Sequence, residues 1–141
     1  ASDIGFLIQT LAKCGTHKVR LTGGEPTLRK DLKEIIEACA NVENIQEVAL
    51  TSNGYRLKHQ LPDLIEAGLT SLNLSADSLD ANLFHEITGH NKLDAVLEAM
   101  RMAVASPLKA VKLNAVLMRQ YNTDSLNDYL DLVKHHLQAI Q

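Results

Sequence analysis

A regular alternation of short strand patterns with amphipathic helix patterns constrains the fold of this chain more than any other feature. The strand patterns, in which apolar residues occupy every second position, cover residues 18–22, 47–52, 71–75 and 110–117. Before, between and after them, helical spacing and cap residues predict helices over residues 4–14, 31–40, 61–67, 81–87, 93–105 and 126–137. Strands that alternate with helices form a parallel sheet through right-handed crossovers. The sequence therefore predicts an α/β fold of four consecutive βα units.

Within each predicted strand, apolar side chains alternate with polar or small ones. Because successive side chains of a strand point to opposite faces, one face of the sheet is apolar. The other face carries Arg20, Thr22, Thr51, Asn73, Ser75, Lys112 and Asn114. A doubly wound sheet is covered by helices on both faces, whereas a barrel encloses one face and places its site at the carboxyl ends of the strands. We therefore predict a partial (β/α) TIM-like barrel whose polar face lines the lumen.

Composition narrows the classes of function. The chain has 141 residues, a net charge of −3 and 45% hydrophobic residues, which suits one domain with an aliphatic core and no nucleic-acid partner. No apolar run reaches the length of a bilayer span, so no membrane partner is expected. The two cysteines, Cys14 and Cys39, have neither metal-site spacing nor a dense disulfide pattern. This cysteine usage predicts a reducing cytoplasmic location.

A double glycine followed by Glu25 and Pro26 comes directly after the first predicted strand. Gly23 and Gly24 let the backbone adopt positive φ and approach a bound molecule closely. No Gly-Lys-Ser/Thr follows them, so the segment is not a phosphate-binding P-loop. Backbone groups and one carboxylate suit a ligand with an ammonium group, although Glu25 could also be a surface acid.

Arg20 and Lys112 form a pair of cations on the predicted polar face. Each lies between apolar neighbours on a strand that we expect to be internal, and an unpaired buried charge is costly. Two cations that face one lumen suit a polyphosphate. Thr51 and Ser75 add hydroxyls at two strand ends, as ligand contacts or equally as strand-terminal caps. Asp77 and Asp80 are interpreted as turn and helix-cap groups, and an acid–base pair is the weaker alternative.

The Gly23–Pro26 motif resembles the Gly-Gly-Glu-Pro signature of radical S-adenosylmethionine (SAM) enzymes. An ordered series of further segments is similar to the middle of one member family, the GTP 3′,8-cyclases of molybdenum cofactor biosynthesis. The series covers nearly the whole chain and comprises residues 20–29, 51–55, 73–80, 84–89 and 111–119.

The resemblance implies a barrel of the radical SAM type and a lyase activity. In that family SAM is cleaved at a [4Fe-4S] cluster, and the resulting radical starts the cyclisation of GTP, the substrate. By matching motifs, the resemblance implies that SAM is bound by Gly23, Gly24, Glu25 and Ser75. It implies that GTP is bound by Arg20, Thr51 and Lys112, and it assigns no catalytic residue or metal ligand to this chain.

Departures from the family limit what the chain is expected to do alone. It has no Cys-x-x-x-Cys-x-x-Cys loop, no first barrel strand and no C-terminal cluster ligands. We therefore interpret residues 1–141 as one domain, a central barrel fragment that lacks the N-terminal cluster loop and the C-terminal domain. Such a fragment is expected to be inactive and to self-associate through its exposed sheet edges or polar face.

Two alternatives stay open at this point. The first is another radical SAM enzyme, for example a peptide-modifying one, which would have no need of two lumen cations. The second is a non-catalytic α/β module that binds a nucleotide or another anion.

Overall fold

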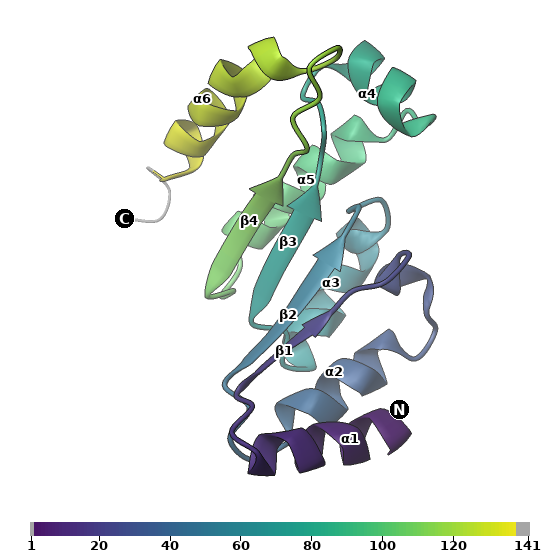
Figure 1. The fold of residues 1–141 in the computed structure, drawn as a ribbon, viewed down its shortest axis with the longest axis vertical. Coiled ribbons are helices and arrows are strands. Elements are labelled where there is room, and N and C mark those ends of the chain that lie inside the picture. The colour runs from purple at the N-terminus through teal and green to yellow at the C-terminus, as the bar shows by residue number, and fades with distance from the viewer. Residues whose placement is uncertain (1, 138–141) are drawn as a thin grey trace.

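The computed structural model describes residues 2–137 and contains one sheet with helices between its strands (Figure 1). The first half comprises α1 (Ser2–Lys13), β1 (Lys18–Leu21), the 3₁₀ turn η1 (Pro26–Leu28), α2 (Leu32–Ala40), β2 (Glu47–Ser52) and α3 (Leu57–Glu66). The second half comprises β3 (Ser71–Ser75), α4 (Ala81–Thr88), α5 (Leu93–Val104), β4 (Ala110–Asn114), the 3₁₀ turn η2 (Thr123–Ser125) and α6 (Leu126–Leu137). The predicted alternation of strands and helices is confirmed.

The sheet is parallel and open, with strand order β1-β2-β3-β4. Figure 1 shows α2, α3 and α5 behind the sheet and no helix across its front, so one face is covered and the other is open. All four strands point toward the end at which α4 lies. The arrangement is that of a βα-barrel segment that has not closed, as the alternation of side chains predicts.

The core lies between the sheet and the covering helices. Leu50 and Leu72 from the central strands, with Ile36 of α2, Leu57 of α3 and Val96 of α5, have no exposed surface. The apolar residues on the helix-facing side of β2 and β3, namely Val48, Leu50, Leu72 and Leu74, are all buried, which fixes the register of both strands. The residues between them along each strand are left on the open face.

Two predicted boundaries were wrong. Helix α3 begins at Leu57, one turn before the predicted start, and Pro62 lies inside it. Leu57 and Leu61 are both buried, so the apolar stripe continues through the first turn and outweighs the proline. Strand β4 ends at Asn114, because the backbone amide of Val116 instead donates to Asp77 Oδ1 at 2.8 Å.

Candidate functional site

The carboxyl ends of β1 and β2 are joined by the carboxylate of Glu25. Its Oε1 atom accepts hydrogen bonds from the Thr27 backbone amide (3.0 Å), the Thr27 hydroxyl (2.6 Å) and the Ser52 hydroxyl (2.8 Å). Its Oε2 atom accepts one from the backbone amide of Asn53 at 2.7 Å. Oε1 is therefore fully used inside the protein, whereas Oε2 keeps a free lone pair for a ligand donor. Glu25 both shapes the loop and offers one acceptor.

Sequence reasoning missed Ser52 and Thr27 as parts of this arrangement. Ser52 is 2% exposed and Thr27 is 1% exposed. Ser52 also accepts a hydrogen bond from the Gly54 amide at 3.0 Å, so it orders the loop after β2 as well. A hydroxyl on the apolar side of a strand was the available signal, because a buried polar group needs a partner.

The backbone conformation requires a glycine at position 23 but not at position 24. Gly23 has φ of 132°, a conformation that strains any residue with a Cβ atom. Gly24 has no such φ, and a Cβ added there would meet no protein atom within 4 Å. The structure therefore does not need glycine at position 24 for folding. The open space beside it, at the end of β1, fits the approach of a ligand to the backbone.

The predicted polar face is present, and its residues lie in register across the sheet. Thr51, Asn73 and Lys112 form one row through β2, β3 and β4. The neighbouring row begins with Arg20 on β1 and continues through Ala49, Ser71 and Ala110. Ser75, exposed at the end of β3, pairs with Asn114. The structure thus places Arg20 and Lys112 at opposite sides of one face and in adjacent rows.

The expectation that Arg20 and Lys112 lie on internal strands was wrong for this chain. They occupy β1 and β4, which are the two edges of the sheet, and both side chains are exposed. Desolvation therefore does not force either one to have a partner. Among residues 2–137, neither forms an ion pair. Their shared face, and not burial, now supports an anionic ligand.

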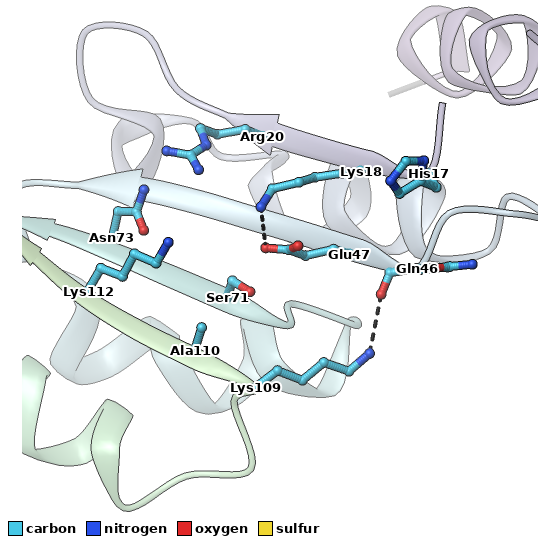
Figure 2. Close-up of a pocket in the computed structure, with 10 residues that line it drawn as sticks. All are labelled: His17, Lys18, Arg20, Gln46, Glu47, Ser71, Asn73, Lys109, Ala110 and Lys112. Atoms are coloured by element: carbon cyan, nitrogen blue, oxygen red, sulfur yellow. Dashed lines mark hydrogen bonds and ion pairs between the residues drawn. The ribbon is translucent and has the colours of Figure 1, made fainter. Parts of the chain in front are cut away.

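A shallow basin of about 360 Å³ lies on this face (Figure 2). Its lining residues are His17, Lys18, Arg20, Gln46, Glu47, Ser71, Asn73, Lys109, Ala110 and Lys112. Lys18 Nζ lies 2.8 Å from Glu47 Oε1. A hydrogen bond from Lys18, and then one from Ser71, lowers the pKa of Glu47 from its ordinary value, and the nearby charges of Lys18 and Lys112 act in the same direction. The basin is strongly positive with one carboxylate, which stays ionised.

The loops after β3 and β4 are fixed to each other beside this face. Asn122, 1% exposed, donates to the carbonyl groups of Asp77 and of Val116, the latter at 2.8 Å. The Tyr129 hydroxyl of α6 donates to the Ala76 carbonyl at 2.8 Å. Burial, with the charges of Asp77 and Asp128, raises the pKa of Tyr129 to about 12.

Asp80 accepts a hydrogen bond from the Leu83 backbone amide at 2.8 Å and caps α4. The cap role predicted for Asp80 is confirmed, whereas the Asp77 carboxylate joins the loop after β3 to Val116 and the turn role predicted for it stays a prediction.

The described residues hold no group of three or more metal-ligating side chains. Cys14 is exposed after α1, while Cys39 is buried in α2, where desolvation raises the pKa of its thiol. The thiols of Cys14 and Cys39 do not make a cluster site, so the described residues do not fit an iron–sulfur cluster. No described helix is long and apolar enough to cross a bilayer.

Comparison with known proteins agrees with the fold and with the motif at the end of β1. The radical SAM superfamily matches residues 2–133, and the chain belongs to that superfamily. Within it, the chain is similar to curated proteins named GTP 3′,8-cyclase. It is 48% identical over 133 residues to the one from Aeromonas hydrophila and 50% identical over 132 residues to the one from Synechococcus elongatus. Each match covers 94% of this chain but only 39% and 40% of the relatives' lengths.

Proposed function

We propose that this chain is the central barrel segment of a cytoplasmic GTP 3′,8-cyclase, a lyase of molybdenum cofactor biosynthesis that converts GTP to 3′,8-cyclo-7,8-dihydro-GTP. One observation carries the proposal: the side chains of Arg20, Thr51, Ser75 and Lys112 lie on the open face of the sheet, and the Gly23–Pro26 motif follows β1 beyond the carboxyl end of the same sheet. The similarity to the named cyclases over 94% of the chain supports the same assignment.

Each of these residues has a role that its geometry suits. Glu25 Oε2 accepts a donor such as the amino group of SAM, the open backbone at Gly24 admits the ligand, and Ser75 lies exposed nearby along the strand ends. Arg20 and Lys112 hold the triphosphate of GTP from two sides, with Thr51 in the row of Lys112. SAM, bound at a cluster whose ligands lie outside this chain, would supply the radical. The chain's own residues bind and orient both molecules.

An anaerobic assay of the full-length enzyme tests the proposal. The protein is reconstituted with iron and sulfide, given SAM, reductant and GTP, and assayed for 5′-deoxyadenosine and the cyclised nucleotide. Lys112→Ala should reduce product formation at limiting GTP by about tenfold or more, because it removes a charge-assisted contact. The matched control is Lys92→Ala, an exposed lysine before α5 that does not line the basin.

The outcomes separate the alternatives. GTP-dependent product that falls in Lys112→Ala and not in Lys92→Ala supports the cyclase. SAM cleavage that does not depend on GTP assigns the protein to another radical SAM reaction, such as peptide modification. A protein that cannot be reconstituted with a cluster would be a binding module. The isolated 141-residue chain should release no 5′-deoxyadenosine, and release by it would contradict the proposed inactivity.

A further inference from the structure

The basin owes its shape to a contrast of side-chain size across the sheet. Two of its lining residues, Ser71 on β3 and Ala110 on β4, are small and lie in register with each other, so this part of the basin floor is low. Long cationic side chains rise from the two edge strands at Arg20 and Lys112 (Figure 2). At about 360 Å³, the space lies in the range of small-molecule sites.

Only some of the cations that line the basin have a partner within the protein. Lys18 pairs with Glu47 at 2.8 Å, and Lys109 donates to the Gln46 carbonyl at 3.3 Å. Within the part of the chain that the structure describes, Arg20 and Lys112 have no ion-pair partner. An anion that enters the basin would therefore be attracted to the side where these two residues lie.

Asn73 lies between the Arg20 and Lys112 side chains in Figure 2. The residue is only 4% exposed, and it lines the basin. No hydrogen bond joins its carboxamide to any residue among 2–137, although its neighbours Ser52 and Ser71 on the central strands both have one. Asn73 is not among the described residues with an enclosed, unpartnered polar atom, so its carboxamide opens onto the basin and its donor and acceptor are free for another molecule. An available amide between two cations without ion-pair partners suits a ligand that enters the basin.

We propose that Asn73 is a substrate-binding residue whose carboxamide contacts the phosphate chain of a nucleotide polyphosphate between Arg20 and Lys112. This inference rests on the proposed function, because it concerns the same substrate. The amide nitrogen donates to a phosphoryl oxygen, and the amide oxygen can accept from the Lys112 ammonium. A neutral amide supplies these contacts without reducing the positive charge of the basin. An aspartate of the same shape would add a second carboxylate to the basin, besides Glu47, and would repel the phosphates.

The test compares Asn73→Asp and Asn73→Leu with the parent in the full-length protein. Calorimetry measures the Kd of three probes: GTP, inorganic triphosphate and guanosine. Asn73→Asp should weaken GTP and inorganic triphosphate by about tenfold or more, since it adds like-charge repulsion to a lost hydrogen bond. Asn73→Leu should weaken both by about three- to tenfold. Guanosine, which has no phosphate, should bind each variant equally.

Asn91→Asp is the matched control, because it makes the same change of charge in an exposed loop before α5. It should leave the Kd of all three probes unchanged. Thermal unfolding of each variant shows whether it folds. If Asn73→Asp does not fold, Asn73→Leu still tests the contact.

Failure of the inference and failure of the proposed function give different results. If the parent cyclises GTP but both Asn73 variants bind inorganic triphosphate with the parent's Kd, Asn73 does not contact phosphate and the inference is overturned. If the parent has an intact cluster but neither binds nor converts GTP, the proposed function fails. Inorganic triphosphate binding that still falls in both variants would then retain Asn73 as a polyphosphate contact, and unchanged binding would remove it.

Discussion

The Ser52 hydroxyl donates a hydrogen bond of 2.8 Å to the Glu25 carboxylate and thereby joins the end of β2 to the loop after β1. The two residues are 27 positions apart in the sequence. The bond closes a set of contacts in which Glu25 also orders Thr27 and Asn53. The glutamate of the motif is thus held in place by the neighbouring strand, so its free lone pair has a fixed direction.

Ser52→Ala should destabilise the protein by about 1–3 kcal/mol, because it removes one of the three hydrogen bonds to Glu25 Oε1 and leaves the Gly54 amide without its partner. Urea denaturation followed by circular dichroism measures the change. Ser75→Ala is the matched control for stability, since Ser75 is exposed and its unfolding free energy should move by less than about 0.5 kcal/mol. Equal stability of the two variants would show that the Glu25–Ser52 bond contributes little.

Alanine substitutions at Gly23 and Gly24 should differ in their effect on stability. Gly23→Ala forces a Cβ atom into φ of 132° and should cost about 1–3 kcal/mol of stability. Gly24→Ala meets no protein atom within 4 Å, so the fold should tolerate it. Under the proposed function, Gly24→Ala fills ligand space and should weaken SAM binding about tenfold in equilibrium dialysis of the full-length protein. SAM binding that is unchanged in Gly24→Ala would remove this position from the site.

The sequence determines β2 and β3 to the residue, because each has alternating apolar side chains between clear turn signals. It identifies the polar face for the same reason, since period-two alternation assigns every side chain to a face. The Glu25–Ser52 contact could not be predicted, because it depends on how the loop after β1 folds against the end of β2. The edge positions of β1 and β4 do follow from four consecutive βα units in an open sheet, so the expectation that Arg20 and Lys112 are internal did not fit the predicted fragment. The start of α3 was missed because Pro62 is a strong local signal that the packing of Leu57 overrides.

Acid should weaken the fold through Glu47. Its folded pKa is lowered from the ordinary 4.5, chiefly by the hydrogen bond from Lys18. A carboxyl group with a depressed folded pKa adds stability above its unfolded pKa, and this stability is lost as the pH falls through the folded value. Between about pH 6 and about pH 3, the melting temperature of Glu47→Gln should therefore fall less than that of the parent. Parallel curves for the two proteins would contradict a role for this ion pair.

Alkali should act through Tyr129. Its folded pKa of about 12 exceeds the ordinary 10.0, because burial disfavours the phenolate. A group with a raised folded pKa adds stability below its unfolded pKa, and this is lost as the pH rises through the folded value, here between about pH 10 and about pH 12. Phenolate absorbance should show one late-titrating tyrosine that is missing in Tyr129→Phe. Tyr129→Phe should also cost about 1 kcal/mol at neutral pH through the lost bond to Ala76.

The isolated chain should self-associate, because β1 and β4 both leave a strand edge unpaired among the described residues. Sedimentation velocity at rising concentration measures this, and one monomeric species throughout would contradict it. Helix α6 offers a competing explanation, since Leu130 and Val133 are each 48% exposed. The double variant Leu130→Lys and Val133→Lys should still associate if the sheet edges cause the association. Loss of association in this double variant would assign the contact to α6 instead.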